Sequence, residues 1–254
     1  MTKETLKTLL IQIDISPEYY KKFVETRTTA TVNILKERNE KVKTNSILFN
    51  GGIAQKFGWH YKLDTIPETK HFSPCFEILK IFRDDSFLEY DRVIYLDTDT
   101  YYYPDSPNIL DYYPDEGFHA VSRMGKIFDS GKEPDHLERI DKKYLIEKYK
   151  QNYFNLGVLL LDRNTIIKMR PFLTHDNIED MLEKRGLWSD DQSAINIAAY
   201  ESGVKINPMH EYWNQMDKRF KEGYIAHLKG SIKNKENVFD KRAEEYLDAI
   251  SSSN

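Results

Sequence analysis

The stretch Arg92-Val93-Ile94-Tyr95-Leu96-Asp97-Thr98-Asp99-Thr100 decides the fold that we predict for this chain. Its apolar residues 93–96 follow a polar turn and favour a strand that is buried on both faces of a parallel sheet. Asp97 and Asp99 follow at the carboxyl end of this strand, which is the edge where open α/β sheets bind ligands. Side chains two residues apart on an extended chain point to the same side, so we expect these carboxylates roughly 6–7 Å apart at Cβ, with Thr98 turned away.

Two carboxylates this close repel each other, and a divalent cation between them relieves the repulsion. An Asp-x-Asp pair is therefore typical of metal sites, but the same pattern also occurs where solvated side chains follow a strand. The rest of the sequence has to distinguish these two interpretations.

Length and composition narrow the class of protein. The 254 residues suffice for one large α/β domain, and we expect residues 1–254 to form a single domain. The net charge of −4 gives no general attraction to nucleic acid or to an anionic membrane. The single Cys75 excludes an intramolecular disulfide and fits a reducing compartment, so we expect a cytoplasmic protein. The apolar residues 9–11 are too few for a signal peptide or a transmembrane segment.

Strands and helices are expected to alternate along the first hundred residues, as in an α/β fold with a mostly parallel central sheet flanked by helices. The predicted strands cover residues 9–13, 46–49, 59–63, 93–96, 118–121, 153–162, 204–207 and 224–227. The predicted helices cover residues 17–35, 138–150, 177–185, 190–202 and 239–250, and one more begins at Pro74. No Gly-rich loop follows the first strand and no Gly-x4-Gly-Lys-[Ser/Thr] loop occurs, which argues against a dinucleotide-binding fold and a P-loop.

Five segments, taken in order, carry a family resemblance. They are residues 95–100, which contain Asp-x-Asp; residues 154–158, Phe-Asn-Leu-Gly-Val; residues 191–196, Asp-Gln-Ser-Ala-Ile-Asn; the pair Trp213-Asn214; and residues 227–233, His-Leu-Lys-Gly-Ser-Ile-Lys. Together they resemble the motifs of the retaining glycosyltransferase family 8, nucleotide-sugar-dependent enzymes of the GT-A fold that include glycogenin and bacterial lipopolysaccharide galactosyl- and glucosyltransferases. The chain departs from the pattern at residues 234–235, where Asn-Lys replaces the usual Pro-Trp.

The resemblance implies transfer of a hexose from a UDP-sugar, UDP-glucose or UDP-galactose, to an acceptor hydroxyl with retention of anomeric configuration. It implies Mn²⁺ as cofactor, with Mg²⁺ as the alternative, held by Asp97, Asp99 and His227. It identifies neither the acceptor, be it a carbohydrate, a lipid-linked sugar or a protein, nor the oligomeric state. The donor-binding residues that it implies are Asp14, Tyr19, Lys80, Asp97, Thr98, Asp99, Asn155, Gly157, Asp191, Gln192, Gly230 and Lys233.

Several of these residues also have a purely structural interpretation. By helical spacing, Lys80 is an ion-pair partner for Glu77 and Asp84. Asp191 lies in the first turn of a predicted helix, where a negative charge is favoured by the helix dipole. Taken alone, His227 fits a hydrogen-bonded histidine at the end of a strand.

Retention leaves two catalytic routes open. A double displacement needs a carboxylate or an amide against the sugar face opposite the leaving group, where Asp191 or Gln192 would stand as the catalytic group. In a front-face route, which we favour, the departing phosphate itself deprotonates the acceptor hydroxyl.

Two other functions fit parts of the sequence. Residues 97–100, Asp-Thr-Asp-Thr, match the Asp-x-Asp-x-Thr motif of haloacid-dehalogenase-type phosphatases. That motif normally ends the first strand of its fold, whereas at least two predicted strands precede it here. A catalytically idle sugar-nucleotide-binding module is the third hypothesis, but such a protein has no need for both the metal ligands and the segment 227–233.

Overall fold

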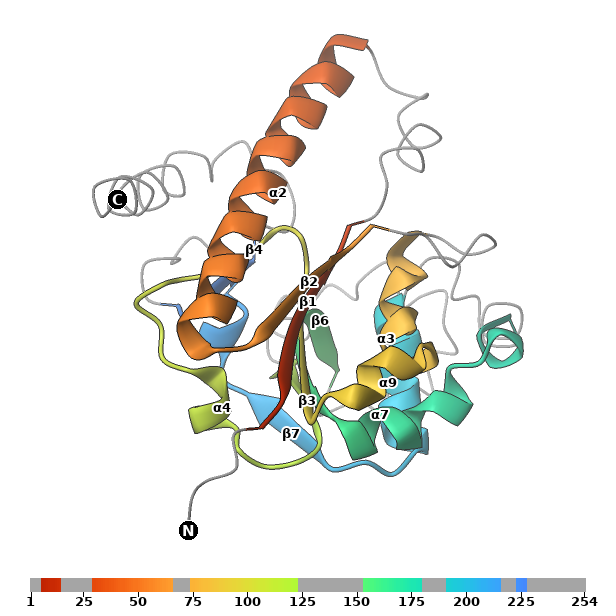
Figure 1. Cartoon of the computed structure of the whole chain (residues 1–254). Helices are drawn as coiled ribbons and strands as arrows, with labels where there is room; N and C mark the ends of the chain where they lie inside the picture. The colour runs from red at the N-terminus through yellow and green to blue at the C-terminus, as the bar shows by residue number, and fades with distance from the viewer. Residues whose placement is uncertain are drawn as a thin grey trace, which may run out of the picture.

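A mixed six-stranded sheet forms the centre of the computed structural model (Figure 1). The structure describes residues 6–14, 29–65, 74–122, 153–179, 191–215 and 223–227. The strands of the central sheet lie in the order β2-β1-β3-β6-β5-β7, and β4 pairs with β8 in a separate two-stranded sheet. The strands are β1 (Thr8–Ile13), β2 (His60–Asp64), β3 (Arg92–Leu96), β4 (Thr100–Tyr102), β5 (Phe118–Ser122), β6 (Phe154–Asp162), β7 (Ile206–Met209) and β8 (Ile225–His227).

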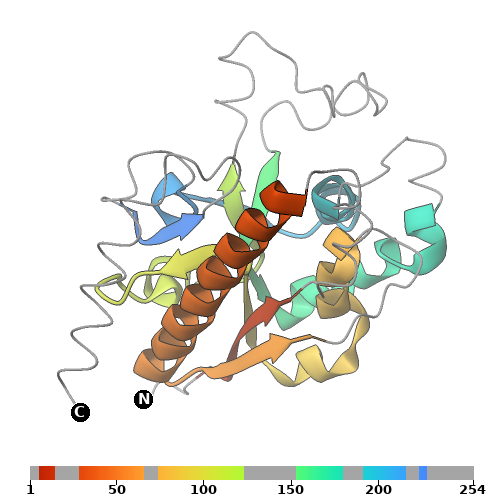
Figure 2. The ribbon, with the colours of Figure 1, turned by 90° about the horizontal axis from the view of Figure 1, so that it is seen from above.

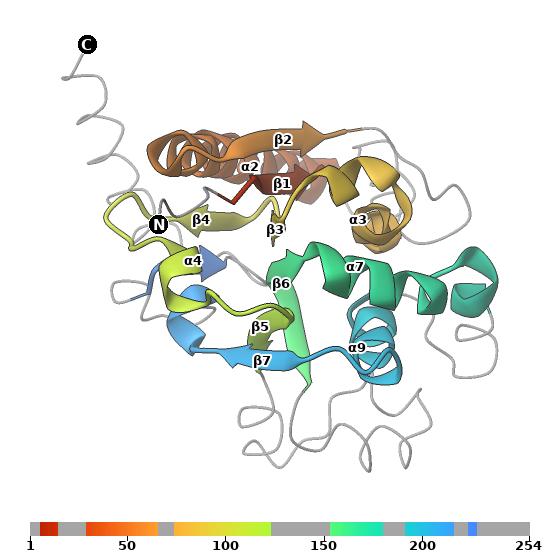
Figure 3. The ribbon, with the colours of Figure 1, turned by 60° about the horizontal axis from the view of Figure 1, so that its bottom comes forward.

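Helices cover both faces of the central sheet. The long α2 crosses one face, and α3, α7 and α9 gather on the other (Figures 2 and 3). No helix in the described part of the chain combines the length and the hydropathy that a bilayer span requires. The helices are α2 (Thr29–Phe57), α3 (Lys80–Arg83), α4 (Ile109–Tyr112), α7 (Arg163–Met169) and α9 (Asp191–Glu201), with the 3₁₀ turns η1 (Pro74–Leu79), η2 (Asp85–Glu89), η4 (Arg170–Phe172) and η5 (Glu211–Trp213).

The central strand β3 is buried on both faces, as its sequence predicts. Val93 and Tyr95 belong to the core cluster that includes side chains of α3, α7 and α9. Ile94 and Leu96 belong to the second cluster, which α2 joins through Ile53 and Ala54. Alternate residues of the strand therefore pack into two separate layers, and the acidic residues that follow leave the sheet at its centre.

The sheet is mostly parallel, but β6 runs against both of its neighbours. β1 is parallel to β2 and β3, and β5 is parallel to β7, whereas β6 is antiparallel to β3 and to β5. The first residues of β6 consequently extend past the carboxyl end of β3, next to the residues that follow it. Leu96 pairs with Val158, and the Asp97 N–H donates to the Gly157 carbonyl at 3.0 Å. This direction brings Asn155 and Gly157 to the same sheet edge as Asp97.

The strand predicted at residues 46–49 is wrong, because these residues lie within α2. The buried positions of this part of the helix are 46, 49, 50, 53 and 54, which is helical periodicity. The pattern is hard to see in the sequence because two of the inward residues, Ser46 and Asn50, are polar. The pair Gly51-Gly52, which suggests a turn, continues the helix instead.

Most other predicted elements are confirmed. The strands predicted at 9–13, 59–63, 93–96, 118–121, 153–162 and 224–227 correspond to β1, β2, β3, β5, β6 and β8, whereas β7 begins two residues later than predicted. Pro74 opens η1, which leads into α3, and α9 ends before Gly203, whose φ is 65°. The first predicted helix corresponds to α2 only from Thr29 onward and continues to Phe57. Residues 15–28, the predicted helices 138–150 and 239–250, and most of 177–185 lie outside the described residues.

His119 is a buried histidine through which pH is expected to act on the stability of the fold. His119 of β5 is 1% exposed. Its Nε2 donates to the Asp115 carbonyl at 2.9 Å, and its Nδ1 is buried without a partner among the described residues. Burial lowers the pKa of His119 to about 4, against the opposing effect of the hydrogen bond to Asp115.

We predict that the free energy of unfolding decreases as the pH is lowered from 6.5 to 4. In this range the histidine of the unfolded chain, with its ordinary pKa of 6.5, binds a proton that the folded state excludes. Above pH 6.5 His119 does not lower the free energy of unfolding, and by pH 4 its protonation in the unfolded chain has lowered it by about 3 kcal/mol. Urea unfolding at several pH values measures the free energy of unfolding. His119→Asn should remove this part of the pH dependence, and His60→Asn, at an exposed position, should keep it. Parallel pH profiles of the wild type and His119→Asn would contradict the assignment.

Candidate metal centre

A tight turn presents the two acidic residues at the end of β3. The Thr100 N–H donates to the Asp97 carbonyl at 3.1 Å, and the Thr100 Oγ1 donates to the same oxygen at 2.7 Å. The segment is therefore not extended, and the local geometry expected from the sequence is wrong. The two carboxylates nevertheless face one point, because the turn directs both of them at Nε2 of His227.

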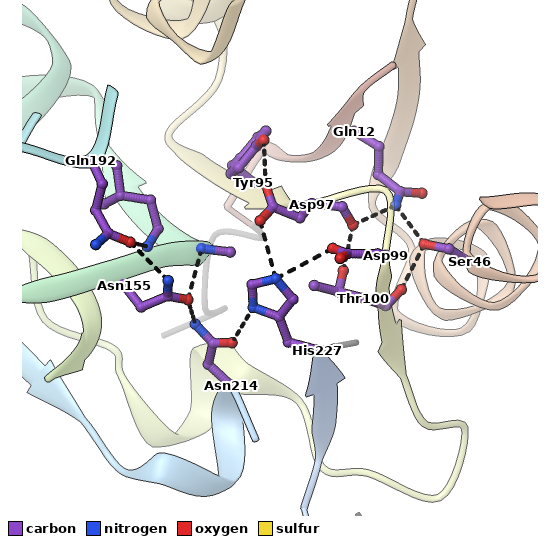
Figure 4. A network of polar contacts seen from close by, with 12 residues as sticks. Gln12, Ser46, Tyr95, Asp97, Asp99, Thr100, Asn155, Gln192, Asn214 and His227 are labelled. Atoms are coloured by element: carbon purple, nitrogen blue, oxygen red, sulfur yellow. Dashed lines mark hydrogen bonds and ion pairs between the residues drawn. The ribbon is translucent and has the colours of Figure 1, made fainter. Parts of the chain in front are cut away.

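Buried polar side chains of β1 and α2 hold the backbone of this turn in place (Figure 4). The Gln12 amide donates to the Asp97 carbonyl at 3.2 Å and to the Ser46 Oγ at 2.8 Å. Ser46 in turn donates to the Thr100 carbonyl at 2.6 Å, and the Asn50 amide donates to the same carbonyl at 3.1 Å. Sequence reasoning missed these three residues. Their only signal is the placement of polar residues at inward positions of an otherwise apolar strand and helix.

His227 completes the site from a distant part of the chain. It ends β8, which pairs with β4 so that His227 lies opposite Thr100. Its Nε2 lies 3.3 Å from Asp97 Oδ2 and 3.3 Å from Asp99 Oδ1 (Figure 4). The ligand atoms of the three side chains all lie within 4.8 Å of one another. His227 is thus a hydrogen-bonded histidine at the end of a strand, as the structural interpretation has it, and in addition it faces two carboxylates.

Gly157 of β6 provides the space that the imidazole occupies. A Cβ at this position would overlap Nδ1 and Cε1 of the His227 ring and would lie 3.0 Å from Asp97 Oδ2. Any side chain here would displace the imidazole from the two acids. Only glycine, which has no Cβ, leaves room for the imidazole at this position, and the sequence pattern alone does not show this.

The donor atoms of this trio fit a divalent cation. Two carboxylate oxygens and one imidazole nitrogen suit Mn²⁺, and Mg²⁺ accepts the oxygens as well. The His227 side chain is 3% exposed, whereas Asp97 and Asp99 are 36% and 39% exposed. A cation here would be held by protein on its inner side and open to a further ligand on its outer side.

A second acidic group, His175, Asp176 and Glu179, is exposed at every member, as solvated helix ends often are.

Tyr95 orients one of the two carboxylates of the site. Its hydroxyl donates to Asp97 Oδ1 at 2.6 Å. Burial raises the pKa of Tyr95 well above its ordinary value, and the negative charges of Asp97, Asp191 and Asp99 raise it further. Tyr95 is therefore a neutral donor that orients one carboxylate, and the charge of Asp191, the first residue of α9, is among those that raise its pKa.

Asn155 and Gln192 lie on the side of His227 that faces away from the two carboxylates, and they contact each other. The Asn155 Nδ2 donates to Gln192 Oε1 at 2.8 Å. Asn155 Oδ1 accepts from Asn214 Nδ2 at 2.6 Å, and Asn214 Oδ1 lies 2.9 Å from His227 Nδ1. The polar partners of Asn155 in this structure are thus protein amides.

Two further predicted donor-binding residues, Asp14 and Lys80, lie near the carboxyl ends of β1 and β2. Asp14 follows β1 and pairs with Lys43 of α2. Lys80 is buried, and its Nζ lies 3.1 Å from Asp64 Oδ1 and 3.8 Å from Glu77 Oε2. The helical pairing with Glu77 that the spacing indicates is therefore present. Thr98 lies in the acidic turn, and Tyr19, Gly230 and Lys233 lie outside the described residues.

Comparison with known proteins gives a match along most of the chain. A model described as glycosyl transferase family 8 matches residues 2–238. The structure resembles a glycosyltransferase involved in the glycosylation of the major capsid of PBCV-1, with 11% identity, a TM-score of 0.51 and coverage of 94% of this chain and 98% of that one. Apo mouse xyloside xylosyltransferase 1 shows 11% identity, a TM-score of 0.46 and coverage of 88% and 97%. Galactosyltransferase LgtC, with donor and acceptor sugar analogues, shows 14% identity, a TM-score of 0.40 and coverage of 88% and 87%. No curated protein sequence matches the chain.

We predict that Gly157→Ala weakens Mn²⁺ binding by at least about tenfold, because the new methyl group displaces the imidazole of His227. Isothermal titration of MnCl₂ into the metal-free protein measures the affinity for Mn²⁺. Gly51→Ala in α2 is the matched control, since its Cβ would meet only the Tyr61 ring, at an ordinary 3.8 Å. Equal Mn²⁺ affinity of Gly157→Ala and the wild type would show that the ring does not need this space.

Proposed function

The chain belongs to glycosyl transferase family 8, and on this premise we propose that it transfers a hexose from UDP-glucose or UDP-galactose to an acceptor hydroxyl with the help of a divalent cation. Membership makes it a glycosyltransferase that takes a sugar from a nucleotide sugar, and its fold is the GT-A fold that the sequence predicts. The identity of the donor, the use of a metal and the retention of configuration are parts of the proposal.

The observation that carries the proposal is the convergence of Asp97, Asp99 and His227, whose ligand atoms lie within 4.8 Å of one another. We assign these residues as the ligands of Mn²⁺, with Mg²⁺ as the alternative. When bound, the cation would supply positive charge against the diphosphate as the sugar leaves. The partly exposed carboxylates leave the outer side of the site open for that diphosphate.

The protein's own groups support a front-face route. Gln192 Oε1 accepts hydrogen bonds from Asn155 Nδ2 at 2.8 Å and from the Leu156 N–H at 3.4 Å. An amide oxygen engaged by two donors is poorly prepared to attack a sugar carbon, which weakens the case for Gln192 as nucleophile. Asp191 then remains as a donor-binding carboxylate near Tyr95. In the proposed route the acceptor hydroxyl passes its proton to the departing phosphate.

The other hypotheses have less support. Asp97 follows β3, the third strand along the described chain and a central one in the sheet, and not the first strand as in haloacid-dehalogenase-type phosphatases. An idle binding module is inconsistent with membership in a transferase family. The low cysteine content supports a cytoplasmic location, which stays a prediction. The acceptor is left open between a carbohydrate, a lipid-linked sugar and a protein.

We predict that the purified protein releases UDP from UDP-glucose or UDP-galactose in the presence of Mn²⁺, slowly even without an acceptor. Asp99→Asn should lower this rate by at least about 100-fold, because the amide removes the negative charge that holds the cation. Separation of UDP from UDP-sugar by ion-exchange chromatography measures the rate. Asp176→Asn is the matched control, since it makes the same change in the exposed acidic group and should leave the rate unaltered.

Two results would argue against the proposal. Hydrolysis of p-nitrophenyl phosphate with no turnover of UDP-sugars would favour the phosphatase. Loss of UDP release in Asp176→Asn, with full activity of Asp99→Asn, would place the cation at the exposed group instead.

A further inference from the structure

A chain of three side-chain amides connects the start of α9 to the imidazole of His227 (Figure 4). Asn155 Nδ2 donates to Gln192 Oε1 at 2.8 Å, and Asn214 Nδ2 donates to Asn155 Oδ1 at 2.6 Å. Asn214 Oδ1 then lies 2.9 Å from His227 Nδ1. Asn155 and Asn214 are 2% and 3% exposed, so water does not compete readily for these contacts. The opposite ring nitrogen, Nε2, faces Asp97 and Asp99.

Backbone N–H groups determine which neighbour the oxygen and the NH₂ group of each side-chain amide face. An amide side chain can be turned so that its oxygen and nitrogen exchange places, but a backbone N–H can only donate. The Gly157 N–H donates to Asn155 Oδ1 at 3.2 Å, and the Leu156 N–H donates to Gln192 Oε1 at 3.4 Å. The oxygen of Asn155 must therefore face Gly157 and Asn214, and its NH₂ group must face Gln192.

The orientation of the Asn155 amide determines which ring nitrogen of His227 carries the proton. Because Asn155 offers an oxygen, Asn214 must offer its NH₂ group to it and its own oxygen to the imidazole. An oxygen facing Nδ1 needs a proton on Nδ1. A neutral imidazole has only one ring proton, so Nε2 then carries a lone pair directed at the gap between Asp97 and Asp99.

This arrangement opposes what the two acids would favour by themselves. Each carboxylate oxygen lies 3.3 Å from Nε2 and would attract a proton to that nitrogen. A proton on Nε2 would occupy the lone pair that a cation needs. The position of the ring does not depend on Asn214 alone, since the His227 N–H donates to the Gln215 carbonyl at 2.9 Å and β8 pairs with β4. The specific contribution of Asn214 is the choice of ring nitrogen.

We propose that Asn214 is a positioning residue that holds His227 as the Nδ1–H tautomer, with Asn155 and Gln192 fixing the direction of the Asn214 amide. This inference rests on the proposed cation site at Asp97, Asp99 and His227. It assigns Gln192 to the support of a ligand, by way of two asparagines, and it explains why an asparagine follows the buried Trp213.

Two measurements test the proposal. In the first, MnCl₂ is titrated into the metal-free protein and free Mn²⁺ is measured by electron paramagnetic resonance. Asn214→Leu, which keeps the size of the side chain, should weaken binding by about 10- to 100-fold. Asn207→Leu is the matched control, because Asn207 lies on β7 and donates to the Glu116 carbonyl at 3.0 Å. Unchanged binding by Asn214→Leu would overturn the proposal.

The second measurement needs no variant to establish the tautomer. In protein with ¹⁵N-labelled histidine, the ring shifts of neutral His227 should show the proton on Nδ1, and Asn214→Leu should move it to Nε2. A proton on Nε2 in the wild type would overturn the assignment even if Mn²⁺ binds. If His227→Ala binds Mn²⁺ as tightly as the wild type, the cation site of the proposed function is wrong, whatever the tautomer.

Discussion

The structure of the site depends on one contact: a single imidazole nitrogen that lies 3.3 Å from an oxygen of each of two carboxylates. Two negative groups that face the same point repel each other, and they stay there only if the surrounding protein fixes them and a positive partner is available. The carboxylates come from the turn after β3, and the imidazole comes from β8, more than a hundred residues later in the chain. The fold is what brings the three groups together.

The protein fixes both halves of this contact with buried hydrogen bonds. On one side, Gln12, Ser46 and Asn50 hold the carbonyls of Asp97 and Thr100. On the other side, Asn214 holds the imidazole and Gly157 leaves room for it. A buried polar group without a partner costs about 1–3 kcal/mol, so these side chains favour only conformations in which the acidic turn and the ring are in place. The precision of the site is thus supplied by residues that carry no charge.

The sequence predicted the general architecture because that part depends on local patterns. An apolar run followed by Asp97 and Asp99 indicated a buried strand with acids at the ligand-binding edge, and the strand is observed as β3. The predictions failed where polar residues face inward, as Ser46 and Asn50 do in α2, because hydrophobic periodicity does not detect them. They also failed for the acidic turn, whose shape is set by tertiary hydrogen bonds. The antiparallel direction of β6, which gives Asn155 and Gly157 their place, has no signal in the sequence of that strand.

The most direct test of the account is a crystal structure of the protein grown with Mn²⁺ and UDP, with anomalous scattering used to locate the metal. We predict one strong anomalous peak in contact with Asp97, Asp99 and Nε2 of His227, next to the bound diphosphate. A peak at His175, Asp176 and Glu179, or a bound diphosphate with no metal at the two aspartates, would contradict it.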